Sequence, residues 1–410
     1  MDAPSPHLGR ALAHREPSGL RRHGPHAPSP AAPATGPWAP GGIAVHETGP
    51  EALARLQQVL TDALQGHALT AQLQLRQAPE DGCVQAFWPL ALQQALAPGH
   101  DTLELHSRLG LPAPQPGREA GDAPETAAAL LLGPHWQDFP SVQELASALR
   151  VRRNVARAAA RTMLDFDTEA VERPWEFWHH DDSRGFHIRE GVSLIDALRQ
   201  ATQPEVSGAR YAFSCYRATE YVLLLGLAEE LQQANPPLYA QLQALWRRRA
   251  IVSAEFHEVF LRETGSLDAP LPPRYYVPGD RVWFRNPDEA SADAAGFEGS
   301  WVIYLGGGHF CNFWEKDRPF DFETKCLEVH HWRDGLWHDA QGEARIDEAR
   351  VAQAMARTRA DPAALARILA RMQRFRDPRG VYAEGGCIDS TREQLRWVCP
   401  GSADLRLPAE

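Results

Sequence analysis

The chain has 410 residues, 43% of them hydrophobic, and a formal net charge of -11 at pH 7. This length allows one large core or two modest cores, and the negative charge gives no electrostatic footprint for nucleic-acid binding. No apolar run of about 18 residues is present, so we expect no membrane span. The N-terminal basic residues are not followed by an apolar segment, so we expect no secretory signal.

Six scattered cysteines argue against a disulfide framework. They are Cys83, Cys215, Cys311, Cys326, Cys387 and Cys399. None forms a C-x-x-C pair, which disfavours a zinc ribbon and a dithiol redox site. We therefore expect a reduced, cytoplasmic protein with no metal.

Residues 1–45 are rich in Pro, Ala, His and Gly, and we predict that they form a disordered tail. Residues 46–135 are interpreted as an N-terminal extension. In this extension "EALARLQQVLTDALQG" has the apolar spacing of an amphipathic helix, "ALTAQLQLRQAP" favours a strand, and "FWPLALQQALAPG" favours a short helix. From "GREAGDAPETAAALL" the chain is predicted to be loop-like.

Helices dominate the next part of the chain. "SVQE" predicts a capped helix start at Ser141. "WEFWHHDDSRGFHIREG" predicts a hairpin rather than a metal site, because its adjacent His and Asp residues would point to opposite faces of a strand. Another capped helix begins after Ser193, and an apolar helix is predicted from Cys215 to about Ala234.

Strands follow these helices. "GDRVWFRNPD" predicts a strand at residues 281–285, and "GSWVIYLGGGHFCNFW" predicts a hairpin that bends at residues 306–308. "KCLEVHHWRDG" is interpreted as one more strand. A final helix is expected after Asp361, with Pro362 at its first position. This order predicts an α+β fold with an antiparallel sheet.

Cys215 stands just before the apolar helix, in "FSCYRATEYVLLLGLAEEL". A thiol in the first helical turn meets unpaired N–H groups and the positive end of the helix dipole, which lower its pKa and make it nucleophilic. An inert thiol in the core explains the same cysteine taken by itself, since free cysteines are often buried.

Five motifs resemble the bacterial spore-coat transglutaminase family, in the same order and with similar spacing. They are "SVQELASALRVRRNVARAAARTML", "AFSCYRATEYVLLLGLAEEL", "GDRVWFRNPD", "GFEGSWVIYLGGGHFCNFW" and "ARVAQAMARTRADPAALARILARM". The resemblance covers about residues 140–375. It implies a papain-like core with a cysteine at the start of a buried helix packed on an antiparallel sheet. We therefore predict a catalytic domain at residues 136–375 and a C-terminal extension at residues 376–410.

The resemblance also implies an activity, a protein-glutamine gamma-glutamyltransferase. Such an enzyme joins glutamine and lysine side chains of protein substrates through a cysteine thioester and needs no cofactor. Cys215 matches the family's nucleophile. Ser214, Ser300 and Asn312 stand where the family has an acidic residue, a glutamate and a histidine, so the sequence departs from the family at the partner positions.

Glu298 is our candidate for the missing carboxylate. If the strand extends back to Glu298, it shares a face with Ser300, because side chains alternate along a strand. Asn312 can orient a neighbouring group but cannot act as a base. His309, His330 and His331 are alternative bases, and at most one of the adjacent pair should face Cys215.

Two other functions remain open. A papain-like cysteine amidase or peptidase would resolve the thioester with water instead of lysine. A catalytically inactive relative would keep the fold as an interaction module, which the departures at residues 214, 300 and 312 favour.

Overall fold

The computed structural model describes residues 41–112, 120–167, 172–181, 183, 185–250, 253–376 and 385–408. Residues Ala39–Glu410 belong to one compact unit. Most of the predicted tail lies outside the described residues. Its last four residues, however, form the buried strand β1, Gly42–Val45. The tail boundary predicted at residue 45 is therefore too late, because Ile43 and Val45 are core residues.

Residues 42–139 build a four-stranded sheet with helices packed on it. The strand order is β2-β3-β1-β4, in which β4 runs parallel to β1 and the other pairs are antiparallel. The other elements are β2 (Gln74–Ala78), β3 (Cys83–Phe87), β4 (Trp136–Phe139), α1 (Pro50–Ala63), α2 (Leu90–Leu96), α3 (Leu105–Arg108) and α4 (Ala123–Leu131). The predicted helices at α1 and α2 are confirmed.

The loop predicted from residue 117 onward is wrong at α4. Ala123–Leu131 is a helix whose residues from Pro124 on are all buried. Alanine and leucine are strong helix formers, and a proline is tolerated in the first turn of a helix. The Gly, Asp and Pro residues ahead of the helix concealed this signal.

A layer of helices follows, and serine caps set where three of them begin. Ser141, Ser193 and Ser214 accept hydrogen bonds from backbone N–H groups three residues later, as N-caps do. The helices are α5 (Val142–Arg161), α6 (Leu194–Thr202), α7 (Pro204–Ser207), α8 (Cys215–Ala234), α9 (Pro236–Arg248) and α10 (Ser253–Phe260).

The predicted hairpin between α5 and α6 is confirmed. Strand β6, Trp178–Asp181, pairs antiparallel with β7, Gly185–Ile188. Residues 182 and 184 of the predicted turn lie outside the described residues. A second small sheet pairs β5, Asp165–Phe166, with β8, Ala212–Phe213, directly before Cys215.

The main sheet has six strands in the order β13-β12-β11-β10-β16-β9, and every neighbouring pair is antiparallel. Its strands are β9 (Leu261–Thr264), β10 (Arg281–Arg285), β11 (Gly299–Gly306), β12 (His309–Phe310), β13 (Phe320–Asp321) and β16 (Arg392–Leu395). The strand predicted at residues 281–285 and the hairpin after residue 299 are confirmed, and so is the α+β class. Strand β16 comes from the predicted C-terminal extension. It lies between β10 and β9, so residues 392–395 are an inner strand of this sheet.

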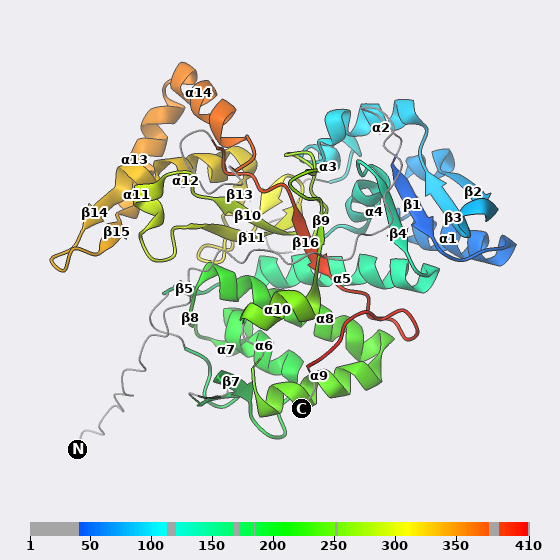
Figure 1. Cartoon of the computed structure of the whole chain (residues 1–410), viewed down its shortest axis with the longest axis horizontal. Helices are drawn as coiled ribbons and strands as arrows, with labels where there is room; N and C mark the ends of the chain where they lie inside the picture. Colours follow the sequence, from blue (N-terminus) through cyan, green and yellow to red (C-terminus); the bar gives the residue numbers. More distant parts are fainter. Residues whose placement is uncertain are drawn as a thin grey trace. The chain divides into compact units, whose positions relative to one another are not determined.

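Helices cover both faces of the main sheet. Helices α5 and α8 pack on β11, whereas α12 packs on β10 (Figure 1). On the α12 side, the ring of Phe284 from β10 lies 6.0 Å from the ring of Phe322. On the α8 side, the ring of Trp301 from β11 lies 5.4 Å from the ring of Tyr216.

The strand predicted around "KCLEVHHWRDG" is wrong, because these residues belong to helix α12, Phe322–Gly335. Asp321 caps this helix by accepting hydrogen bonds from the backbone N–H and the hydroxyl of Thr324. The cap together with helix-forming Glu, Lys and Leu residues outweighs the local run of Val, His and Trp. The remaining elements are α11 (Glu289–Ala292), β14 (Leu336–His338), β15 (Ala344–Ile346), α13 (Glu348–Arg359) and α14 (Pro362–Met372).

The helix predicted after Asp361 is confirmed as α14, with Pro362 at its start. No helix in the described ranges is long and apolar enough to cross a membrane.

Glu144 ties the C-terminal segment to α5. Its buried carboxylate accepts hydrogen bonds from the backbone N–H groups of Val398 (2.9 Å) and Cys399 (3.0 Å) and from the hydroxyl of Ser402 (2.6 Å). In a full capping box this side chain would bond back to the N-cap residue. Here it stabilises residues that follow β16 instead.

We predict that Glu144→Ala lowers the free energy of unfolding by about 3 kcal/mol, because two buried N–H groups and a hydroxyl lose a charged acceptor. Denaturant unfolding followed by circular dichroism measures this difference. Gln143→Ala, on the exposed neighbouring position, is the control and should change stability by less than about 0.5 kcal/mol. Equal effects of the two variants would show that Glu144 does not anchor the C-terminal segment.

Candidate active site around Cys215

Cys215 is the first residue of α8, and the capping bond from Ser214 fixes the start of this helix. A buried apolar helix continues from Ala218 to Leu231 and holds the first turn in place. Cys215 is half-buried, whereas the other five cysteines are buried. The prediction that this thiol lies at the start of a buried helix is therefore confirmed.

The sulfur of Cys215 lies at an open edge of β11. Strand β12 pairs with β11 only from Tyr304 onward. Ahead of that pairing, the N–H of Ile303 donates to the sulfur of Cys311 at 3.1 Å. The backbone N–H of Trp301, two residues earlier, lies close enough to the sulfur of Cys215 to lower the pKa of its thiol. The sulfur atoms of Cys215 and Cys311 thus lie beside successive outward-pointing N–H groups of β11. Such groups are about 7 Å apart along a strand.

Several groups act on the Cys215 thiol, with opposite effects on its pKa. Burial raises the pKa above its usual value, and the nearby Glu298 carboxylate raises it further. The backbone N–H groups of Trp301 and Tyr216 and the Lys325 ammonium lower it. The net result is a raised pKa, which differs from the lowered pKa expected for a first-turn cysteine. Desolvation of the thiolate outweighs the helix terminus here.

Glu298 lies close enough to influence Cys215 but is not part of β11. The strand begins at Gly299, so the strand extension on which the shared face with Ser300 depended is not formed. Glu298 lies in an exposed bend, and its backbone carbonyl accepts a hydrogen bond from Asn286 at 3.0 Å. It is nevertheless the one carboxylate among the main electrostatic influences on the Cys215 thiol.

Ser300 and Trp301 point to opposite faces of β11. Ser300 pairs with Phe284 across the ladder, on the face that packs against α12. Trp301 pairs with Trp283, and the two indoles stack with ring centroids 5.3 Å apart.

Asn312 is buried and serves its own loop. Its carbonyl oxygen accepts hydrogen bonds from the backbone N–H groups of Trp314 and Glu315, both at 3.1 Å. Its amide nitrogen donates to the carbonyl of Arg318 at 3.0 Å. These bonds hold the turn that follows Cys311, so the structure gives Asn312 a loop-forming role beside the site.

The three candidate histidines lie on different elements. His309 is on β12, beside the bend of the hairpin. His331 is buried on α12, where its ring nitrogens contact Asp334 at 2.7 Å and Thr358 at 2.9 Å, so this ring is engaged away from Cys215. Burial and the charge of Arg333 lower the pKa of His330 to about 4. We expected His330 and His331 to point to opposite faces of a strand. This expectation is wrong, because both residues lie on helix α12.

A buried ionic network that the sequence did not reveal lies behind Trp301. Arg281 is 1% exposed and donates to Thr219 at 2.9 Å and to Glu393 at 2.8 Å. The second carboxylate oxygen of Glu393 lies 3.3 Å from His257, which raises the pKa of that histidine. These residues come from four elements that lie far apart in the sequence, from α8 to β16. Neither His257 nor Glu393 lies in a quoted motif, so no local signal marks them.

The same arginine connects this network to the thiol. Its guanidinium carbon lies 4.4 Å from the ring centre of Tyr216 and 4.1 Å from that of Trp301. These two residues also supply the backbone N–H groups that meet the sulfur of Cys215. Arg281 therefore stabilises the positions of both donor residues through cation–π contacts.

Aromatic side chains gather next to the site. Phe166 on β5 is 37% exposed, and its ring lies 5.1 Å from Trp314 and 5.9 Å from Phe297. Strand β5 pairs with β8 just before Cys215, and Phe297 directly precedes Glu298. An apolar, partly exposed surface thus lies among the segments that surround the thiol.

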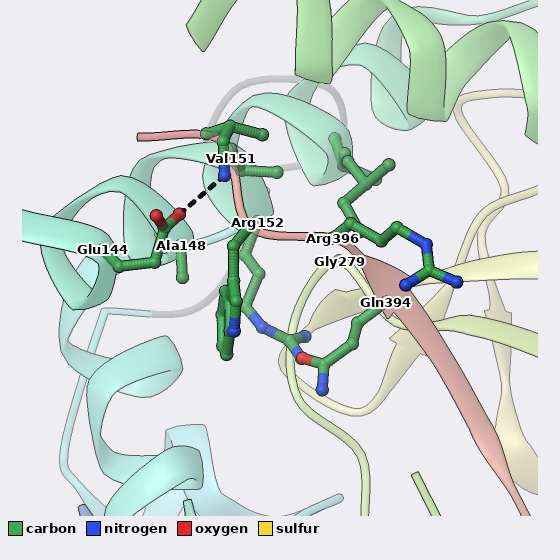
Figure 2. Close-up of a pocket in the computed structure, with 11 residues that line it drawn as sticks. Glu144, Ala148, Val151, Arg152, Gly279, Gln394 and Arg396 are labelled. Atoms are coloured by element: carbon green, nitrogen blue, oxygen red, sulfur yellow. Dashed lines mark hydrogen bonds between the residues drawn. The ribbon is translucent and has the colours of Figure 1, made fainter. Parts of the chain in front are cut away.

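The pocket in Figure 2 lies elsewhere, between α5 and the residues after Gln394. Its polar side chains already have partners, since Arg152 pairs with Asp280 at 2.7 Å and also bonds Gln394, while Glu144 binds the C-terminal backbone. None of the predicted site residues lines it. We assign this pocket to packing rather than chemistry.

No group of three or more His, Cys, Asp or Glu side chains in the described part of the chain could hold a metal ion.

Comparisons with known proteins give a family and one similar structure. The model of the family described as protein-glutamine gamma-glutamyltransferase matches residues 117–404. No curated protein matches the chain. Among solved structures, a transglutaminase from Geobacillus stearothermophilus (without C-terminal extension) is similar, with 18% sequence identity and a TM-score of 0.37. The match covers 52% of this chain and 98% of that one.

We predict that iodoacetamide modifies Cys215 before the other five cysteines, since Cys215 is the one that is not fully buried. Only the thiolate reacts, and the raised pKa leaves little of it at neutral pH. The rate should therefore rise about tenfold per pH unit between about pH 7 and 8.5. Peptide mass mapping after timed alkylation measures both properties. A rate that is constant over this range would show that the thiolate is already formed at neutral pH.

A second prediction concerns Arg281. Arg281→Met should slow the alkylation of Cys215 and move its pH dependence upward, because Tyr216 and Trp301 lose the guanidinium that contacts both rings. Arg281→Lys keeps the charge beside Glu393 but not the planar stacking, so it should restore folding more than it restores reactivity. Arg285→Met, on the same strand, is the matched control. Unchanged alkylation in a folded Arg281→Met protein contradicts the positioning role.

Proposed function

The chain belongs to the protein-glutamine gamma-glutamyltransferase family, and from this premise we propose that Cys215 is the nucleophile of a papain-like acyltransferase site. The substrates are proteins that supply a glutamine carboxamide and a lysine amine. The observation that carries the proposal is the position of the half-buried thiol, at the start of α8 and against the N–H of Trp301.

The first half of the reaction forms a thioester. The Cys215 thiolate attacks the carboxamide carbon of a glutamine side chain, and the carbonyl oxygen becomes negatively charged. Backbone N–H groups of Trp301 and Tyr216 lie beside the sulfur and are suited to stabilise this charge. The base that took the thiol proton returns it to the carboxamide nitrogen, the C–N bond breaks and ammonia leaves, and the glutamyl group remains bound to sulfur.

The second half transfers the glutamyl group to lysine. A neutral lysine amine attacks the thioester carbonyl, a base takes its proton, and the C–S bond breaks as the isopeptide bond forms. We assign the base to Glu298, because its carboxylate acts on the Cys215 thiol and is exposed to incoming substrate. The aromatic group of Phe166, Phe297 and Trp314 is suited to pack on the methylene groups of either substrate side chain.

The raised pKa of Cys215 favours a second candidate, an inactive relative that serves as an interaction module. A papain-like amidase is a third, since water can resolve the same thioester.

One assay separates these functions. The protein is incubated with a glutamine-bearing donor protein and a tagged primary amine, and tag incorporation and ammonia release are both measured. A transglutaminase gives both, an amidase gives ammonia without the tag, and an inactive relative gives neither. Cys215→Ala should abolish both signals, and its retention of activity would overturn the proposal.

Glu298→Gln is predicted to lower turnover by about two to four orders of magnitude, the usual contribution of a general acid–base group. Folding should persist, because the change is nearly isosteric and the side chain is exposed. Ser300→Glu in the Glu298→Gln background should recover part of the activity by supplying a replacement carboxylate near the strand edge. If Glu298→Gln is fully active while His309→Ala is inactive, the base is the histidine.

A further inference from the structure

Lysine is nearly absent from this chain. Of its 42 lysine and arginine residues, Lys316 and Lys325 are the two lysines. A lysine amine is one of the two groups that the proposed reaction consumes, whereas an arginine side chain cannot replace it, because its guanidinium stays protonated. The small number of lysines therefore limits how many acyl-acceptor amines this chain itself can supply to the proposed reaction.

Lys325 is not available to another molecule. Its side chain is 3% exposed on α12, and its ammonium bonds the Glu328 carboxylate at 2.5 Å. The same ammonium lies 3.4 Å from the ring centre of Phe320. An amine that is buried, charged and held on two sides cannot extend into the site of a second enzyme molecule.

Lys316 is also held by a carboxylate. Its ammonium forms an ion pair with Glu205 of α7, and this contact lowers the pKa of that carboxyl group. The Lys316 side chain is 18% exposed. The pair connects the turn after Asn312 with α7, so the lysine stem lies along the protein rather than in solvent.

Glutamine shows the opposite distribution. The chain contains 22 glutamines, and many are exposed. In the described part of the chain the exposed ones are Gln57, Gln58, Gln65, Gln72, Gln74, Gln77, Gln94, Gln143, Gln232, Gln233, Gln241, Gln341 and Gln353. The surface thus presents many glutamine carboxamides, while both lysine amines are held by carboxylates.

We propose that this chain does not link to copies of itself and that its acyl acceptor is a lysine-bearing protein of another kind. The inference rests on the proposed transglutaminase function and specifies its partner. In each turnover a glutamine carboxamide and a lysine amine become one isopeptide bond and one ammonia. The chain supplies the first group from its surface but not the second. Its exposed glutamines also allow it to be joined to the lysine-bearing protein as an acyl donor.

The test restores amines at exposed positions and asks whether self-linking appears. Arg247 on α9 and Arg367 on α14 are exposed. The double variant Arg247→Lys with Arg367→Lys keeps the charge and adds two accessible amines. The matched control, Arg247→Gln with Arg367→Gln, adds carboxamides but no amine. The full chain of each protein is incubated alone, then with a small tagged amine, and finally with casein as a lysine-bearing probe.

The expected result has three parts. The wild type and the glutamine control stay monomeric on denaturing gels, while the lysine variant forms covalent oligomers. The cross-linked peptides of these oligomers contain the amines introduced by the two Arg→Lys changes. All three proteins incorporate the tagged amine into their own glutamines. All three also become attached to casein.

Two results would overturn the inference alone. One is a wild-type protein that forms covalent oligomers through its own amines. The other is a lysine variant that stays monomeric although it incorporates the tagged amine, because lysine scarcity would then not be what prevents self-linking. Failure of every protein to incorporate the tagged amine into any donor overturns the proposed function, and this inference with it.

Discussion

The site depends on one contact, between the first turn of α8 and the uncovered edge of β11. Strand β12 reaches β11 only at Tyr304, so the N–H of Trp301 has no partner on β12, and it lies beside the sulfur of Cys215. The contact places the thiol against the edge of the sheet. The proposed chemistry uses a sulfur that the start of α8 and the edge of β11 hold in place.

The remainder of the sheet supports this contact from behind. Arg281 on β10 lies against the rings of Tyr216 and Trp301 and is held by Glu393, which belongs to β16. Glu144 in turn binds the backbone that follows β16. Two carboxylates thus hold the C-terminal residues in place, Glu393 through Arg281 and Glu144 through the backbone of Val398 and Cys399.

Two positions at which we expected a departure from the family pattern have structural roles here. Ser214 caps α8, and Asn312 closes the turn after Cys311 with three hydrogen bonds. Neither supplies a charge to the thiol, and burial is the largest influence on its pKa, which it raises. A carboxylate at the surface, Glu298, then becomes the main acidic influence on the sulfur. This arrangement leaves proton transfer to a group that substrate binding would enclose.

Local patterns in the sequence were enough for the elements that carry the site. The apolar run after Cys215 and the turn residues around "RVWFR" and after "SWVIYL" predicted α8, β10 and the β11–β12 hairpin, because each depends on neighbouring residues. Two interpretations of local patterns were wrong. The residues around His330 became a helix under the Asp321 cap, and Glu298 fell outside β11. Only the tertiary structure brought Glu393, Arg281 and Trp301 together behind the thiol, since no spacing rule relates residues on strands that pair across the whole length of a chain.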